Sequence, residues 1–262
     1  MRKYLALVSV LALTASTFAG APTLQVSLAV RETGAAGDVG DDAGTANGIE
    51  WIDLDGQTLT LDGTWQLFSF DMANDPVTAF AGAGANGILG DTDGDGVPDV
   101  STGAVEHIRL RSNGFAGDIT LWIDDVADTL DPPGPPPPAT IVFGGFEDPA
   151  QVNASGEVMF QEPTFSGSTA AHIDAAGPNA SVRDDTVANT GVASTRVAWR
   201  FLDNDPSRWL RLTTFSRAQL PLGSPLIRFD QSSVVSFWVM GVPEPASLAL
   251  LALGGLAIWR RR

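Results

Sequence analysis

The residues Thr23-Leu-Gln-Val-Ser-Leu-Ala-Val30 alternate in character, which places Leu24, Val26 and Leu28 on one face of an extended chain. A period of two is typical of a strand with one buried face. Similar runs follow at residues 64–70, 105–111, 118–124, 194–202, 209–213 and 233–240. Helical periodicity is almost absent between residues 22 and 241. Short strands separated by Gly, Asp and Pro turns predict an all-β protein, either a β-sandwich or a jelly roll.

Two segments between these strands carry strong turn signals. Asp55-Gly56 stands between the alternating runs 48–54 and 57–61, and such a pair favours a tight hairpin turn. We therefore expect a hairpin over residues 48–61. The Gly-, Ala- and Asp-rich stretches 33–47 and 80–96 predict long loops.

The proline-rich stretch 132–138 divides the body of the chain into residues 22–131 and 139–241. A run of this kind favours an extended polyproline II spacer. Each half could form a small sandwich, or both halves could contribute strands to one jelly roll. We favour the composite jelly roll, because a shared sheet pairs strands that two half-domains would leave as edges.

The body of the chain is strongly acidic. The sequence holds 31 acidic and 15 basic residues, of which Glu244 and five basic residues lie outside 22–241. The body thus carries 30 acids, ten arginines and no lysine, a net charge of −20. Such a surface repels nucleic acid, which we exclude as a partner. With no cysteine, the chain has no disulfide, catalytic thiol or zinc–thiolate site.

Both ends of the chain carry targeting patterns. Met1-Arg-Lys3, the apolar run 5–13 and the small residues Ala19 and Ala21 predict a secretory signal peptide over residues 1–21. At the other end, Val242-Pro-Glu-Pro-Ala-Ser247 precedes an apolar run that closes with three arginines. The apolar run predicts a short hydrophobic helix, and the arginines favour a cytoplasmic C-terminus.

Residues 242–262 resemble the PEP-CTERM sorting domain of Gram-negative bacteria, with motif, apolar run and basic cluster in order. The resemblance implies recognition by an exosortase, a membrane cysteine protease, and cleavage near Pro243, Glu244 and Pro245. It further implies delivery to the cell surface or the extracellular matrix, with membrane contact only before processing. The alternative is a permanent anchor of a single span.

One segment has the spacing of a calcium loop. Carboxylates at positions 1, 3 and 5 with a glycine at position 6 suit Ca²⁺, which prefers oxygen ligands in a sharply turned loop. The predicted ligands are Asp91, Asp93, Asp95, Val97 through its carbonyl, and Asp99. The loop, over residues 91–102, resembles those of dockerins and thrombospondin type 3 repeats, but Thr102 replaces the usual bidentate glutamate. We expect structural calcium, with Glu106 a candidate to complete the shell, and a solvated acidic turn as the alternative.

The segments Gly63–Phe68, Leu121–Val126 and Phe146-Glu147-Asp148 resemble parts of carbohydrate-binding jelly rolls of the galactose-binding-like class. The six tryptophans of the body could stack on sugar rings or fill the core. Arg208-Trp209-Leu210-Arg211 could hold a sugar acid or form an outward charged face.

Signs of catalysis are few, because His107 and His172 stand in no catalytic motif. We therefore expect a non-catalytic surface or matrix protein, for example of a biofilm, with polysaccharide as the candidate ligand. The alternatives are a carbohydrate-active enzyme with an unrecognised site and a purely structural matrix component.

Overall fold

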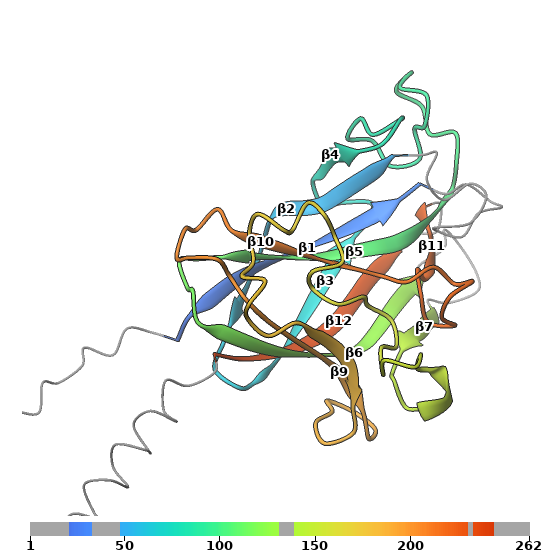
Figure 1. The fold of residues 1–262 in the computed structure, drawn as a ribbon. Helices are drawn as coiled ribbons and strands as arrows, with labels where there is room; N and C mark the ends of the chain where they lie inside the picture. Colours follow the sequence, from blue (N-terminus) through green and yellow to red (C-terminus); the bar gives the residue numbers. More distant parts are fainter. Residues whose placement is uncertain (1–20, 33–47, 131–138, 230–232, 244–262) are drawn as a thin grey trace, which may run out of the picture.

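The computed structural model describes residues 21–32, 48–130, 139–229 and 233–243. These residues form two antiparallel six-stranded sheets that pack face to face as a sandwich (Figure 1). The all-β prediction is therefore confirmed. No helix within the described ranges is long and apolar enough to cross a bilayer.

Sheet A has the strand order β10-β5-β1-β2-β4, and β11 also pairs with β5. Its strands are β1 (Thr23–Arg31), β2 (Ile49–Thr60), β4 (Val77–Ala81), β5 (Thr102–Ser112), β10 (Trp209–Thr213) and β11 (Leu226–Arg228).

Sheet B has the order β3-β12-β6-β9-β8, and β7 also pairs with β6. Its strands are β3 (Trp65–Asp71), β6 (Asp118–Leu130), β7 (Ala139–Gly144), β8 (Ala180–Asp184), β9 (Ser194–Arg200) and β12 (Val234–Pro243). A short 3₁₀ helix covers Pro149–Gln151. Both sheets combine strands from before and after residues 131–138.

The core lies between the two sheets and follows the alternation of the strands. Leu24, Val26 and Leu28 are fully buried in it, and so are Trp199 and Phe237 from sheet B. Burying one apolar face of each sheet is the main stabilising contribution to such a sandwich. The side chains on the opposite face of each sheet point away from this core.

The predicted hairpin over residues 48–61 is wrong. Both runs belong to the single strand β2, which pairs with β1 along its length. Val26 lies opposite Gln57 and Leu28 opposite Ile52, so the intervening residues 53–56 bulge out beside Ser27. Asp53 and Gly56 both have positive φ, at 51° and 80°. The Asp-Gly pair thus makes a bulge, because β1 is long enough to pair with both runs.

The predicted loop 80–96 begins slightly too early, since β4 extends to Ala81. The chain then forms a compact loop, residues 82–100, at one end of sheet A. Gly90 has a φ of 86°, and a Cβ there would lie 2.3 Å from the Val100 carbonyl oxygen. Only glycine fits this close approach.

The sorting motif begins inside the last strand. In the register of β12 with β6, Val242 lies opposite Thr120 and Pro243 opposite Ile119. The remainder of the motif, Glu244 and Pro245, lies outside the described residues, as does Ala19 at the other end. Ala21 is described and comes just before β1.

Candidate functional site

The acidic loop brings three of its four aspartates together. Carboxylate oxygens of Asp91, Asp93 and Asp99 lie within 4.8 Å of one another. Asp91 is buried, and its two oxygens accept from the backbone N–H groups of Gly94 (2.7 Å) and Gly96 (2.8 Å). These bonds fold the loop around the Asp91 carboxylate and leave Asp93 and Asp99 exposed beside it. Oxygen ligands in this arrangement suit a hard cation.

The other predicted ligands are placed differently. The Asp95 side chain accepts from the Val97 N–H at 2.8 Å and stands apart from the three-aspartate group. Glu106 does not complete the ligand shell of the acidic loop, because its carboxylate forms a buried ion pair with Arg31. That pairing crosses from β1 to β5, and no local sequence pattern indicates it.

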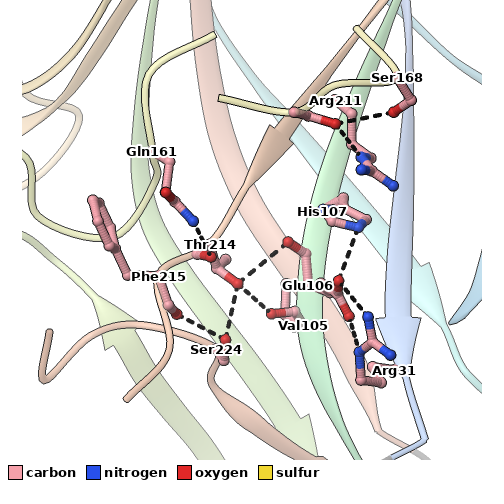
Figure 2. A network of polar contacts seen from close by, with 11 residues as sticks. Arg31, Val105, Glu106, His107, Gln161, Ser168, Arg211, Thr214, Phe215 and Ser224 are labelled. Atoms are coloured by element: carbon pink, nitrogen blue, oxygen red, sulfur yellow. Dashed lines mark hydrogen bonds and ion pairs between the residues drawn. The ribbon is translucent and has the colours of Figure 1, made fainter. Parts of the chain in front are cut away.

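The ion pair of Arg31 and Glu106 includes His107 as a third member (Figure 2). A register shift in the β1–β5 ladder, between Ala29 and Val30, places Glu106 and His107 on the same side of β5. His107 Nε2 lies 3.2 Å from Glu106 Oε1, and Arg31 Nη2 donates to the same oxygen at 2.8 Å. This trio is buried at the outer face of sheet A.

Burial and pairing set the charges of the trio. Burial lowers the pKa of His107 to about 4, despite the neighbouring Glu106 carboxylate. Burial alone would raise the pKa of Glu106, but contacts with His107 and Arg31 outweigh it and lower the pKa to about 2. At neutral pH the trio therefore consists of one guanidinium, one carboxylate and one neutral imidazole, and its charges balance.

Further along the same face lies a second group, which we call the arginine face: Arg109, Arg111, Arg211, Trp51, Phe80 and Trp209. Register places Arg211 opposite Arg109 and Trp209 opposite Arg111 across β10 and β5. The Arg109 guanidinium lies 5.8 Å from the Trp51 ring centre and 5.6 Å from that of Trp209. The Arg211 guanidinium lies 5.2 Å from the Phe80 ring. Guanidinium groups and aromatic rings thus interleave across the sheet.

The arginines of the arginine face make no ion pair with an acidic side chain among the described residues, although Asp55 acts on Arg109 and Glu106 on Arg211 at longer range. Ion pairs in the described part of the chain use other arginines, namely Arg31, Arg196, Arg200 and Arg208. Arg109 donates to the Leu54 carbonyl and Arg211 to the Ser166 hydroxyl, both neutral acceptors. The Nε of Arg111 is buried without a hydrogen-bond partner. Burial, and next the Arg111 charge, lower the pKa of Arg109 to about 10.

The tryptophans divide between the core and the outer faces of the two sheets. Trp199 is fully buried between the sheets, whereas Trp51 packs on the outer face of sheet A. On the outer face of sheet B, Met240 lies opposite Trp65 on one side and Trp122 on the other. Both of these tryptophans are half-buried. Sheet B therefore carries an aromatic row without the arginine cluster of sheet A.

Two further carboxylates, Asp124 and Glu157, support loops. Asp124 is buried and accepts from the backbone N–H groups of Asn189 (2.7 Å) and Thr190 (3.2 Å). Glu157 accepts from Asn153 Nδ2 and from the Glu162 N–H. These contacts hold turns in place.

The comparisons with known proteins concern the C-terminus. Residues 241–262 match the family model of the PEP-CTERM protein-sorting motif. The motif implies an exported protein that an exosortase processes and that is sorted to the cell surface of a Gram-negative bacterium. No curated protein and no solved structure matches the chain.

Proposed function

We propose that this exported protein is a non-catalytic binding module that holds a carboxylate-bearing polysaccharide on its arginine face. The observation that carries the proposal is the gathering of Arg109, Arg111 and Arg211 without an ion-pair partner among the described residues. A guanidinium group matches a carboxylate in shape and charge, and aromatic rings stack on sugars. The half-buried rings of Phe80 and Trp209 lie beside the guanidinium groups, so the face supplies both kinds of contact, whereas Trp51 is buried beneath them.

The net charge of the body limits how this binding works. A body near −20 repels a polyanion at long range. Screening reduces that repulsion beyond about 8–10 Å at physiological ionic strength, whereas contacts on the arginine face act at hydrogen-bond distance. Binding should therefore depend on individual sugar-acid groups that reach the face, and neutral regions of a polymer should add ring stacking.

A non-catalytic role accords with the state of the histidines. His107 is buried and has a pKa of about 4, which keeps it neutral and away from solvent. The His172 ring packs against Trp209 with ring centres 5.0 Å apart. The resemblance to galactose-binding-like jelly rolls points in the same direction, towards sugar binding without turnover.

The aromatic row on sheet B favours a second candidate, binding of a neutral polysaccharide. Trp65 and Trp122 flank Met240 in register, and their side chains are half-buried. Such a row offers rings for stacking, and the guanidinium beside it, that of Arg196 opposite Trp122, is already paired with Asp184.

A binding experiment separates the two faces. The full chain in mild detergent is titrated with alginate, a uronic-acid polymer, and with neutral dextran. We expect alginate binding that Arg109→Gln with Arg111→Gln weakens by about tenfold or more, the loss of at least one charge-assisted contact. Trp122→Ala on sheet B is the matched control and should leave it unchanged. Dextran binding that depends on Trp122 would favour the second candidate, and release of sugar would make the protein an enzyme.

Calcium binding by Asp91, Asp93 and Asp99 is a separate proposal, supported by the approach of their oxygens. A bound ion would offset the repulsion between these carboxylates and stabilise the loop 82–100. At about 100 times the dissociation constant, Ca²⁺ would contribute about 2.7 kcal/mol to the free energy of unfolding. Chelator should lower the melting temperature of the wild-type chain, and Asp93→Asn with Asp99→Asn should reduce that difference. An unchanged melting curve would leave the loop a solvated turn.

A further inference from the structure

Two glutamates lie on the core side of sheet A, at the end covered by the loop 82–100. Glu50 is opposite Val30 in the β1–β2 register, and the Glu32 N–H donates to the Gly48 carbonyl at 3.1 Å, which continues that register. Paired and alternate residues share a face, and Val30 is part of the core. Glu32 and Glu50 therefore point to the inner side, as diagonal neighbours within reach of each other.

Each glutamate has one oxygen bound and one oxygen without a partner. Glu32 Oε1 accepts from the Gly90 N–H at 2.6 Å, and Glu50 Oε1 accepts from Asn86 (2.7 Å) and Gly87 (3.1 Å). The Oε2 atoms of both residues are buried without a hydrogen-bond partner. Both side chains are fully buried, with 0% of their surface exposed. Unpartnered buried carboxylate oxygens are costly unless something neutralises them.

The charges around this pair are negative. Burial raises the pKa of Glu32 to about 7, and the carboxylates of Glu50, Asp91 and Asp99 raise it further against the Gly90 hydrogen bond. Burial likewise raises the pKa of Glu50. The nearby Arg31 lies on the other side of the strand and is bound to Glu106. The pair is thus without a basic side chain that could balance it.

We propose that Glu32 and Glu50 bind a divalent cation through their unpartnered oxygens, at a buried position beneath the loop 82–100. This position is distinct from the exposed group of Asp91, Asp93 and Asp99. A cation offsets the repulsion of two carboxylates and supplies the missing partner of each Oε2 atom. Oxygen ligands favour Ca²⁺, and the loop backbone, held to both glutamates, offers carbonyl oxygens to complete the shell.

The site would also fasten the loop to the sheet. Gly90 binds Glu32 through its N–H and receives bonds from Asp99 (2.6 Å) and Val100 (3.0 Å) at its carbonyl. An ion held by Glu32 thus orders the same turn that positions Asp91. Binding at the buried and the exposed position should therefore be cooperative.

Calorimetric titration of the chelator-stripped full chain in mild detergent, with Ca²⁺ and then Mg²⁺ as the added ions, tests the proposal. The double variant Glu32→Gln with Glu50→Gln should bind one ion fewer than the wild-type chain. Asp93→Asn with Asp99→Asn should retain the buried ion. With chelator present, the glutamine variant should melt at a higher temperature than the wild type, because the repulsion is gone.

The alternative is that the glutamates share a proton. The glutamine variant would then bind Ca²⁺ with unchanged stoichiometry and affinity, and the proposal would fail. It would fail as well if Asp93→Asn with Asp99→Asn abolished all binding. If only the exposed position fails to bind, the result is different. Asp93→Asn with Asp99→Asn then leaves the number of bound ions unchanged, while the glutamine variant still binds one ion fewer than the wild type. Should the double variant not fold, Glu32→Gln alone should weaken binding by about tenfold or more, since affinity follows ligand charge.

Discussion

The buried trio and the arginine face lie on the same side of sheet A and share strand β5. They differ in whether the positive charge of each arginine is paired with a carboxylate. Glu106 and His107 belong to a closed group in which Arg31 is balanced by a carboxylate. Two residues further along, Arg109 begins a group that has rings and neutral acceptors around its guanidinium. In the first group a guanidinium and a carboxylate balance each other, whereas the guanidinium groups of the second have no carboxylate within ion-pair distance among the described residues.

This difference teaches where to look for function in an acidic protein. A paired charge in a sheet stabilises the fold only when both members stay together. An arginine that stays without an ion pair beside rings, in a body with three acids for each arginine, remains able to pair with a carboxylate from outside the chain. The contrast can be tested by changing one group at a time.

The largest effect is expected from breaking the trio. Glu106→Gln leaves the Arg31 guanidinium buried without its carboxylate, and such a loss costs about 3–5 kcal/mol of unfolding free energy. Urea unfolding followed by tryptophan fluorescence measures it. A cost below about 1 kcal/mol would mean that the pair is no more than a surface ion pair.

Acid should act on the trio through His107. Its pKa is about 4 in the folded chain against 6.5 when exposed, so stability is lost as the pH falls from 6.5 towards 4. The shift corresponds to about 3 kcal/mol at most. Glu106 adds a loss between pH 4.5 and 2. Burial raises the pKa of Asp124 and Asp128 to about 6 and that of Glu32 to about 7, which acts the other way.

The measurement therefore compares the pH dependence of the unfolding free energy in the wild-type chain and in His107→Gln. His107→Gln should remove the part of the loss between pH 6.5 and 4, while the opposing contribution of the buried carboxyl groups with raised pKa remains. Identical profiles for the variant and the wild type would show that His107 is already charged in the folded chain.

Removing a ring from the arginine face should cost less. Trp209→Ala deletes the ring beside Arg109 and the contact with His172. We expect a loss of about 1–2 kcal/mol, in the range of a partly desolvated cation–π contact with its packing. Trp209→Phe, the matched control, keeps a ring and should recover much of the loss in thermal unfolding.

The smallest effect on stability is expected for Arg111→Gln. The side chain makes no ion pair with a described residue, so its removal should change the unfolding free energy by no more than about 0.5 kcal/mol. Its effect should appear instead in the salt dependence of alginate binding, which should become weaker. A large loss of stability without any change in binding would place Arg111 with the trio.

The sequence predicts the strands well where alternation is clean. Residues 23–30, 105–111 and 209–213 all lie in strands, because a sheet with one buried face imposes a period of two. The Asp55-Gly56 signal failed because pairing with the long strand β1 overrode a local turn preference. Strand β11 is three residues long and has no pattern to detect.

The candidate sites also differ in whether their residues are close together in the sequence or are brought together by strand pairing. The approach of Asp91, Asp93 and Asp99 follows from local spacing and was predictable. The ion pair of Arg31 with Glu106 joins residues 75 positions apart, and it depends on β1 lying beside β5. Glu32 and Glu50 look like ordinary polar residues at strand ends until the register shows that both face the core.

Strand β12 has a mechanical consequence. It lies between β3 and β6, and its last described residue is Pro243 at the start of the sorting motif. Anything that holds the chain beyond Pro243 therefore pulls on an inner strand along its own axis. The ladder bonds on both sides then carry the load in shear and must yield together, whereas a tether on an edge strand such as β7 would open its bonds one after another. An attachment through the sorting motif would thus load the body at the strand where its sheet best resists being pulled apart.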